Sequence, residues 1–358
     1  MNKINELRKG MRKEGIDCLA IVPGPNLYYI TGKKFHLSER PVVFFIEEDN
    51  LTFILPELES QKLSGLDVNS ITYNDETGPQ HAFEHFFENR SFSKVGIESR
   101  LMRHLELRLI SKDSEKVVDS MHIFAELRTI KSSHEIEMIE KAVSIAEKSI
   151  SSIIHKLGSG ISEKEFASEL VIQLLKNGSE PSLPFSPIVA SGVNGANPHH
   201  FPTDKIVKKD ELVIIDWGAN HENYFSDITR TFATGKNVDP KLLEAFELVR
   251  LANSAARKKS ARGVKAGDVD LAARSMIEEK GFGDFFIHRT GHGLGLEIHE
   301  EPNIKQGEDF ILSSGNVYTI EPGIYIPGLG GIRIEDDVLI SSSGCRSLTT
   351  LSRDLIYI

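Results

Sequence analysis

Apolar residues in the first third of the chain come in short runs that are separated by proline, glycine, asparagine and aspartate. The runs are rich in valine, isoleucine, phenylalanine and tyrosine, which favour β-strands. They predict strands at residues 18–22, 27–31, 42–47, 51–55 and 94–97. The helices predicted in the same region lie at residues 4–11, 58–63 and 102–112. This alternation of strands and helices predicts an α/β domain over residues 1–122.

Beyond residue 131, the apolar positions recur at steps of three and four over longer stretches. Ser132 with Glu135, and Ser162 with Glu165, have the spacing of a capping box, in which two side chains satisfy backbone groups at the start of a helix. The helices predicted here cover residues 132–157, 162–177, 240–249 and 268–280. Strands that end in polar residues lie between and after these helices. Residues 123–358 therefore predict a second domain of mixed α+β type.

Composition limits the classes of protein that the chain can represent. Of its 358 residues, 40% are hydrophobic and 26% are charged, which is ordinary globular usage and excludes collagen, coiled coil and general disorder. The 42 lysines and arginines are outnumbered by 52 aspartates and glutamates, so the formal net charge is -10. That balance argues against binding nucleic acid through bulk positive charge, and we expect no nucleic-acid partner.

The chain carries no evident targeting or membrane segment. No apolar run reaches the roughly 18–20 residues that a membrane span needs. The basic N-terminal segment leads into a short apolar stretch that contains Asp17 and ends at Pro23, so a secretory signal is not expected. Cys18 and Cys345 are too few for a disulfide framework and suit a reducing compartment. We expect a cytoplasmic protein.

The first candidate for chemistry is a pair of aspartates, Asp216 and Asp227, at the two ends of a predicted hairpin. A buried strand carries Asp216, and a short loop returns the chain to a strand behind Asp227, so the hairpin could set the carboxylates side by side. Two such charges about 4 Å apart repel by roughly 4 kcal/mol at an effective dielectric near 20. A divalent cation between them removes this repulsion. A capping aspartate and a surface aspartate would explain the pair equally well.

A second candidate is the segment 288–300, which combines histidines with closely spaced glycines. His292 and His299 flank Gly293 and Gly295, and glycines let the backbone approach a ligand closely. A phosphate-binding loop is disfavoured, because the segment lacks a strand before it, a helix after it and the Lys-Ser/Thr pair. The helical zinc motif His-Glu-x-x-His is absent as well.

Two further carboxylates follow apolar strands, Glu321 in the run TIEPGIY and Glu335 in the run GIRIEDD. Glutamate is rarely buried unless it is paired or bound to a metal, although each of these residues alone is expected at the surface. Taken together with Asp216, Asp227 and one histidine, they form a set of four hard carboxylates and an imidazole. Four carboxylates balance the charge of two divalent cations, which predicts a two-metal hydrolytic site.

The chain resembles the pita-bread metallopeptidases, and among them the Xaa-Pro peptidases (prolidases and Xaa-Pro aminopeptidases). The resemblance covers residues 28–32 (YYITG), 38–41 (SERP), 127–131 (LRTIK) and every motif of the second domain. It implies an α/β N-terminal domain of the creatinase/prolidase type and an α+β pita-bread catalytic domain. Methionine aminopeptidases usually lack the first domain, and creatinases lack the intact ligand set. The chain departs from the family at Asn223, where a glycine is common, but asparagine tolerates the left-handed conformation of a tight turn.

The resemblance also implies roles for single residues. The implied ligands of two divalent ions are Asp216, Asp227, His292, Glu321 and Glu335. A hydroxide between the metals would attack the scissile carbonyl, with Glu321 as general base and later acid. His199 and His299 match the substrate-handling histidines and would hydrogen-bond the carbonyl or the developing oxyanion. An arginine two residues before the last ligand matches Arg333.

Several features permit more than one interpretation. Arg333 could pair with a carboxylate of the protein or with the C-terminal carboxylate of the substrate. Tyr325 could form a wall of the proline pocket or simply pack, and Trp217, the only tryptophan, is expected in the core. The oxygen-rich ligand set favours manganese, although cobalt, zinc and iron also bind such sets.

The resemblance predicts an enzyme that cleaves short peptides with proline at the second position, as a dipeptidase or as an aminopeptidase. It also implies a homodimer in which the first domain, with residues 39–41, reaches the active site of the partner subunit. One alternative is a pita-bread protein that binds a peptide or protein without turning it over. Another is a hydrolase of a different carbon–nitrogen bond. The five intact ligands disfavour the non-catalytic alternative.

Overall fold

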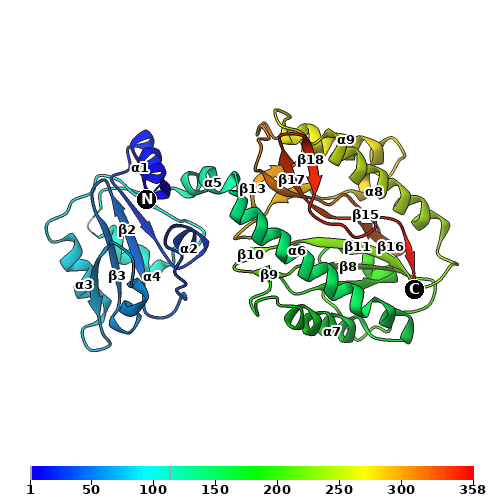
Figure 1. Cartoon of the computed structure of the whole chain (residues 1–358), viewed down its shortest axis with the longest axis horizontal. Helices are drawn as coiled ribbons and strands as arrows, with labels where there is room; N and C mark the ends of the chain where they lie inside the picture. Colours follow the sequence, from blue (N-terminus) through cyan, green and yellow to red (C-terminus); the bar gives the residue numbers. More distant parts are fainter. Residues whose placement is uncertain (1, 113) are drawn as a thin grey trace. The chain divides into compact units, whose positions relative to one another are not determined.

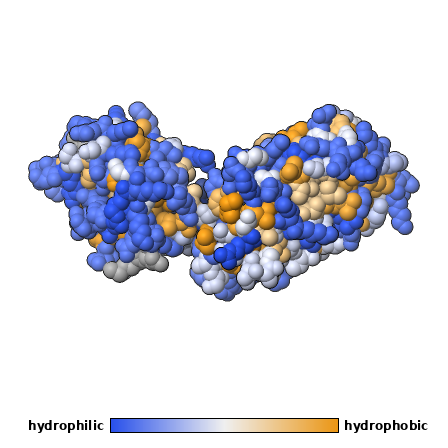
Figure 2. Space-filling view, turned by 90° about the horizontal axis from the view of Figure 1, so that it is seen from above, coloured by the Kyte–Doolittle hydropathy of each residue, from blue (hydrophilic) through white to orange (hydrophobic). Residues whose placement is uncertain are grey.

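The structure, a computed structural model, describes residues 2–112 and 114–358. The chain divides into two compact units, one extending to Arg128 and the other covering Thr129–Ile358 (Figure 1). No helix in the described ranges has both the length and the apolar character that crossing a membrane requires. The face seen in Figure 2 is largely hydrophilic, and hydrophobic residues occur on it in separate patches. The α/β and α+β architectures predicted from the apolar pattern are confirmed.

The first unit is built on a six-stranded mixed sheet with the order β4-β3-β2-β1-β5-β6. Its strands are β1 (Cys18–Ile21), β2 (Val43–Glu47), β3 (Leu51–Pro56), β4 (Asn69–Tyr73), β5 (Val95–Ile97) and β6 (Val117–Asp119). Its helices are α1 (Asn2–Glu14), α2 (Pro25–Thr31), α3 (Gly78–Phe87), α4 (His104–Ser111) and α5 (Met121–Thr129), with a 3-10 helix, η1 (Glu57–Leu63).

Both faces of this sheet are covered by helices. Side chains alternate between the two faces along each strand, so an apolar strand contributes to a core on each side. Cys18 and Ala20 of β1 join a cluster that includes phenylalanines of α3 and apolar residues of α4. Leu19 and Ile21 point the other way, into a cluster with apolar residues of α1 and α5. Near-continuous apolar strands therefore mark a sheet between two helical layers.

The prediction of a strand at residues 27–31 is wrong, because these residues form helix α2. Pro25 occupies the first turn of the helix, where its fixed φ and missing N–H do no harm. Gly32 ends the helix at φ 68°, and its N–H donates to the Tyr28 carbonyl at 2.7 Å. The aromatic and β-branched composition favoured a strand, but these helix-start and helix-end residues prevailed. Residues 58–63, predicted as a helix, fall within η1.

The second unit contains a four-stranded sheet in the order β19-β11-β8-β7, a five-stranded sheet in the order β13-β12-β14-β17-β18, and two hairpins. The strands outside the hairpins are β7 (Ile188–Ser191), β8 (Leu212–Trp217), β11 (Ile228–Ala233), β12 (Gly291–Gly293), β13 (Glu300–Ile304), β14 (Val317–Ile320), β17 (Asp336–Ser341), β18 (Gly344–Ser347) and β19 (Ile356–Tyr357). The hairpins are β9 (Asn220–His221) with β10 (Tyr224–Phe225), and β15 (Gly323–Ile326) with β16 (Gly330–Arg333).

Helices enclose these strands. The long helices are α6 (Ser133–Ile153), α7 (Glu163–Lys176), α8 (Pro240–Lys259) and α9 (Ala266–Glu278), and the 3-10 helices are η2 (Ile154–Ser159), η3 (Gly192–Ala196) and η4 (Gly283–Phe285). In Figure 1, α6 and α7 lie along one side of the strands, and α8 and α9 lie along the other. The main core of this unit combines apolar residues of α8 and α9 with those of β14 to β17.

Both predicted capping boxes are present. The Glu135 N–H donates to Ser132 Oγ at 3.3 Å, and the Ser132 N–H donates to the Glu135 carboxylate at 2.9 Å. Ser162 and Glu165 make the same pair of hydrogen bonds at the start of α7. These local interactions fix where the two helices begin. Helix α7 is followed by β7, η3 and the loop at residues 197–203, and β7 and this loop border the cavity described below.

Candidate metal centre

A hairpin brings Asp216 and Asp227 to the same cavity. Strands β8 and β11 are antiparallel, with Asp216 opposite Thr229, so Asp227 lies one residue before β11 at the same end of the pair. Between them, β9 and β10 are joined by Glu222 and Asn223 at φ 50° and 68°, which is the doubly positive turn that closes a tight hairpin. Both carboxylates are buried, with exposed fractions of 9% and 5%. This burial excludes the alternative of a capping aspartate and a surface aspartate.

A second hairpin, β15 with β16, stands between Glu321 and Glu335 in the same way. Glu321 follows β14 directly, and Glu335 directly precedes β17. Each pair of candidate carboxylates therefore flanks a short hairpin, and both pairs border one cavity of about 570 Å³.

His292 lies on β12 and faces both pairs of carboxylates. Its Nε2 is 3.2 Å from Glu321 Oε1 and 3.6 Å from Asp227 Oδ2. One donor atom each from Asp227, His292 and Glu335 lie within 4.8 Å of one another. The structure thus gathers all five sequence-predicted ligands around the cavity, three of them at mutual distances that a metal ion could bridge.

The electrostatics of the cluster favour a bound cation. Burial raises the pKa of Asp216, Asp227 and Glu335, and neighbouring carboxylates raise each of them further. Asp216 Oδ1 and Asp227 Oδ1 are buried and have no hydrogen-bond partner among the described residues. Unpartnered buried carboxylate oxygens are costly, and divalent cations accept such oxygens as ligands. The residues present therefore fit a divalent metal site.

Glu321 differs from the other three carboxylates. Burial raises its pKa, but the hydrogen bond and charge of His292, with the charges of His288 and Arg333, outweigh burial and lower the pKa to about 2. The Glu321 carboxylate is therefore ionised at neutral pH, with 15% of its side chain exposed to the cavity. It is the one carboxylate of the cluster whose pKa is lowered, so it carries its negative charge into the cavity without a bound proton.

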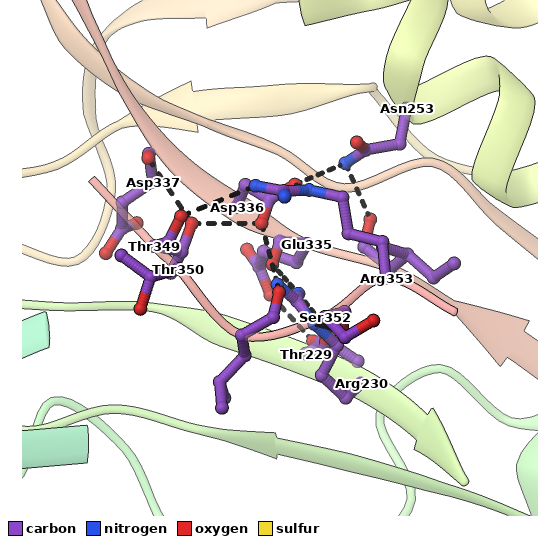
Figure 3. A network of polar contacts seen from close by, with 12 residues as sticks. Thr229, Arg230, Asn253, Glu335, Asp336, Asp337, Thr349, Thr350, Ser352 and Arg353 are labelled. Carbon is purple, nitrogen blue, oxygen red and sulfur yellow. Dashed lines mark hydrogen bonds and ion pairs between the residues drawn. The ribbon is translucent and has the colours of Figure 1, made fainter. Parts of the chain in front are cut away.

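A polar network fixes the backbone that carries Glu335 (Figure 3). Asp336 accepts hydrogen bonds from Arg230, Asn253 and Arg353 at 2.8, 2.9 and 2.7 Å. Arg230 also donates to the Glu335 carbonyl. Burial raises the pKa of Asp336, but the charges of Arg230 and Arg353 outweigh it and hold the pKa at about 2. Asp336 is thus a structural carboxylate, and it ties the start of β17 to β11 and α8.

Arg333 is committed to the protein. Its Nη2 donates to Asp216 Oδ2 at 2.6 Å, and its Nη1 donates to the Tyr325 hydroxyl at 2.8 Å. Its Nε donates to Thr229 Oγ1 at 3.1 Å. Of the two interpretations of Arg333, the structure favours the internal ion pair, in which the guanidinium orients a candidate ligand.

Tyr325 lies behind this arginine. Its ring is 3% exposed and packs with Ala190 and Ile214, and it is not among the residues that border the cavity. The hydroxyl lies 2.9 Å from His288 Nε2. The structure therefore places Tyr325 in a supporting position and gives it no contact with the space where a substrate would lie. Trp217 is fully buried, as expected from the sequence.

His199 and His299 both border the cavity. His199 lies on the loop after η3, and its side chain is exposed. The next residue, His200, anchors this loop, because its Nε2 lies 2.9 Å from Glu163 Oε2. The His299 ring meets the His292 ring edge to face at 4.4 Å. Burial and then the charges of His292 and Arg289 lower the pKa of His299 to about 4, so it is neutral at pH 7.

Two residues that border the cavity, His288 and Arg289, were not predicted as site residues. Both belong to the histidine-glycine segment, but they precede β12. No alternating or helical pattern of apolar residues includes them, so the sequence does not indicate which way their side chains face. Apolar side chains complete the lining, among them Phe185, Ile188 and Ile298.

Comparison with known proteins agrees with this geometry. Residues 137–342 match Metallopeptidase family M24, and residues 3–130 match the Creatinase/Prolidase N-terminal domain. The chain belongs to metallopeptidase family M24. As a member of this family it is a metal-dependent peptidase, and the cluster of four carboxylates and an imidazole is the part of the chain suited to bind the metal.

Several relatives of this M24 metallopeptidase match it over nearly their whole length. The Xaa-Pro dipeptidase of Pyrococcus horikoshii is 36% identical over 99% of this chain and 98% of that protein. The crystal structure of a dipeptidase from Pyrococcus horikoshii OT3 has a TM-score of 0.93 at 37% identity, covering 99% of this chain and 100% of that one. The crystal structure of the X-Pro aminopeptidase from Thermotoga maritima has a TM-score of 0.84 at 31% identity, covering 98% and 100%.

Proposed function

We propose that this M24 metallopeptidase hydrolyses the peptide bond before proline in short Xaa-Pro peptides. The observation that carries the proposal is the cavity in which four carboxylates and an imidazole converge, next to two further histidines and an apolar wall. The similarity over nearly the whole chain to a protein named Xaa-Pro dipeptidase supports the substrate class.

The residues that would hold two divalent cations are Asp216, Asp227, His292, Glu321 and Glu335. When bound, such a pair of cations supplies Lewis acidity and lowers the pKa of a bound water to near neutral. We favour manganese because the donor set is rich in oxygen, with cobalt, zinc and iron as the alternatives. Elemental analysis of protein purified without added metal distinguishes them.

Glu321 is the proposed general base and acid. It would take a proton from the attacking water and deliver it to the proline nitrogen that leaves. Its ionised state at neutral pH, and the contact of its Oε1 with His292, support this assignment.

His299 and His199 would orient the scissile carbonyl. Because His299 is neutral at pH 7, its N–H can donate a hydrogen bond to an oxygen without adding a charge to the cavity. Removing one donor of this kind costs about 3 kcal/mol of transition-state stabilisation. Arg333 would act indirectly, by holding the Asp216 carboxylate in position.

The test is hydrolysis of Ala-Pro and of Ala-Pro-Ala by metal-stripped protein reconstituted with Mn²⁺, Co²⁺, Zn²⁺ or Fe²⁺. Cleavage of either peptide after reconstitution, and not before, supports the proposal. Cleavage of Ala-Pro alone identifies a dipeptidase, whereas cleavage of Ala-Pro-Ala identifies an aminopeptidase. If no metal supports cleavage of either peptide, the proposed function is wrong. The chain would then be a non-catalytic peptide-binding protein or a hydrolase of another carbon–nitrogen bond.

We further propose that the enzyme is a cytoplasmic homodimer. Both cysteines are free, which suits a reducing compartment. The dimer rests on the family resemblance of the first domain, and gel filtration at low micromolar concentration tests it. Elution as a 40 kDa monomer, the mass of one chain, would contradict the dimer.

A further inference from the structure

A buried ion pair lies beside the loop that carries His299. The Lys131 ammonium and the Glu300 carboxylate are 3.0 Å apart, and their side chains are only 2% and 5% exposed. Lys131 directly precedes the capping box of α6, and its N–H donates to the Gly315 carbonyl at 2.8 Å. Glu300 is the first residue of β13 and directly follows His299. The pair therefore connects the beginning of the second unit to the residue next to a proposed substrate-handling histidine.

The Glu300 carboxylate also holds the loop from within. Its Oε1 accepts a hydrogen bond from the Glu297 N–H at 2.9 Å, and the Gly295 N–H donates to the Glu297 carbonyl at 3.1 Å. A Cβ added to Gly295 would lie 3.0 Å from both Glu300 carboxylate oxygens and 3.1 Å from Lys131 Cε. The glycine therefore lets the loop pack directly on the ion pair. The loop closes around one carboxylate, and Lys131 holds that carboxylate in place.

The His299 ring depends on this backbone for its direction. The ring borders the cavity and meets the His292 ring edge to face at 4.4 Å. A hydrogen bond to one nitrogen commonly sets the tautomer and direction of a functional histidine. In the part of the chain that the structure describes, neither nitrogen of His299 makes such a bond. The ring contact with His292 and the backbone at residues 297–300 are therefore what orient it.

A buried ion pair is suited to fixing a backbone in one position. Desolvation of the two charges offsets most of their attraction, so such a pair adds little net stability compared with apolar residues of the same size. Separating the pair is costly, however, because either group then becomes a buried charge without a partner. Lys131 and Glu300 thus allow few alternative arrangements of the segments that carry them.

We propose that Lys131 is a positioning residue of the active site, which acts through Glu300 on the backbone of residues 297–300 and so directs His299 toward the scissile carbonyl. This inference rests on the proposed function, in which His299 hydrogen-bonds that carbonyl. Misplacing a group of this kind by about 1 Å can cost about 10²-fold in rate. Loosening the loop should therefore slow the chemical step and leave the affinity for substrate largely unchanged.

The experiment measures hydrolysis of Ala-Pro by metal-reconstituted Lys131→Met. We expect kcat to fall by about 10- to 100-fold and KM to stay within about threefold. Metal content per chain should be unchanged, because within residues 2–112 and 114–358 the polar contacts of Lys131 include no proposed ligand. Lys141→Met is the matched control, since Lys141 pairs with Glu137 on α6 at 3.0 Å and its side chain is 47% exposed. This control should keep kcat within about twofold.

A double-mutant cycle separates positioning of His299 from a general structural effect. If Lys131 acts through His299, adding Lys131→Met to His299→Ala should lower kcat by no more than about twofold further, because the contact is already lost. A general structural effect predicts instead that the two losses multiply. Losses that multiply, or a Lys131→Met variant with unaltered kcat, overturn the role of Lys131.

Glu300→Gln keeps the inference falsifiable if Lys131→Met does not fold. Glutamine retains the size of the side chain and removes the charge that holds Lys131. We therefore expect kcat to fall by about tenfold or more, again with no further loss in the His299→Ala background. An unaltered kcat, or losses that multiply, would overturn the inference here as well.

Amide hydrogen exchange gives a readout that does not depend on activity. The Glu297 N–H should exchange about tenfold faster or more in whichever of Lys131→Met and Glu300→Gln folds, and at the unaltered rate in Lys141→Met. Equal exchange in all of these proteins overturns the inference. If the unaltered enzyme cleaves no peptide with any metal, the proposed function fails, and this inference fails with it. Cleavage by the unaltered enzyme together with losses that multiply removes the role of Lys131 alone.

Discussion

Glu163 offers the sharpest test of how the fold supports the cavity. Its carboxylate lies at the start of α7, is fully buried, and accepts hydrogen bonds from several surrounding N–H and O–H groups. Oε1 accepts from the Ser191 N–H, the Ser191 hydroxyl and the Asn194 amide at 2.7 to 2.9 Å. Oε2 accepts from the Thr203 N–H and hydroxyl at 3.1 and 2.8 Å, and contacts His200 Nε2 at 2.9 Å. One carboxylate thus holds both ends of the loop that carries His199.

We expect Glu163→Gln to lower the free energy of unfolding of the second unit by about 4 kcal/mol or more at pH 7. Loss of the negative charge of Glu163 accounts for most of this decrease in the free energy of unfolding. Burial raises the pKa of Glu163, but the hydrogen bonds from Ser191, His200 and Asn194 outweigh it and lower the pKa from 4.5 to about 2. At 1.36 kcal/mol per pKa unit, that difference corresponds to about 3 kcal/mol. In addition, the glutamine NH₂ must face other donors, which costs about 1–3 kcal/mol.

The pH dependence follows from the direction of this shift. A carboxyl whose pKa is lower in the folded protein stabilises it fully above the unfolded pKa of 4.5 and loses that effect as the pH falls toward 2. Glutamine does not titrate. The difference in the free energy of unfolding between the unaltered protein and Glu163→Gln should therefore narrow by about 2 kcal/mol between pH 7 and pH 3.

Urea unfolding followed by the fluorescence of Trp217 measures this difference. Trp217 is the only tryptophan and is buried in the second unit, so its emission reports on the unit that contains Glu163. Glu165→Gln is the matched control, because glutamine also serves in a capping box and that carboxylate is exposed to solvent. A difference that is the same at pH 3 as at pH 7, or that widens, would refute the reasoning.

Three further outcomes are expected. Glu321→Gln should lower kcat by about 10²–10⁴-fold, and turnover within tenfold of the unaltered enzyme would remove the general-base role. Chelation of the metal should lower the stability seen by Trp217 fluorescence by about 3 kcal/mol if free metal stood at 100 times its Kd, and an increase on chelation would contradict the metal site. Gly291→Ala should destabilise the unit by about 3 kcal/mol or more, because the added Cβ would meet the Thr319 carbonyl oxygen at 1.8 Å. Gly158→Ala, whose Cβ comes no closer than 3.5 Å to another residue, should leave the thermal midpoint within a degree or two.

Local signals in the sequence predicted much of the fold. The capping boxes at Ser132 and Ser162 are complete within four residues, so no distant contact is needed to find them. The segment at residues 27–31 shows the limit of composition, because its aromatic and β-branched residues outweighed Pro25 and Gly32 in the prediction. Edge strand β4 was missed since only one of its five residues is buried, which leaves no apolar period to detect.

The candidate site was predictable as a set and not residue by residue. Glu321 and Glu335 were each expected at the surface when considered alone, and Asp216 with Asp227 could equally have been a capping and a surface aspartate. Only the number of these carboxylates and their positions next to apolar strands indicated a shared metal. The placement of Tyr325 and Arg289 depends on how β15 and β12 pack within the second unit. That packing involves contacts between distant segments, which no local pattern reports.

The division of the proposed ligands between two hairpins and one separate strand means that the metal site can form only when distant parts of the second unit have come together. Asp216 with Asp227, and Glu321 with Glu335, are each within reach of one hairpin, while His292 comes from β12. A single hairpin offers only two carboxylates, so a partly synthesised or partly unfolded chain is a weak chelator and an incomplete protease. Peptide cleavage begins only when the last of these strands is in place. Loss of either hairpin removes two of the five proposed ligands, so activity should depend on the whole unit being folded.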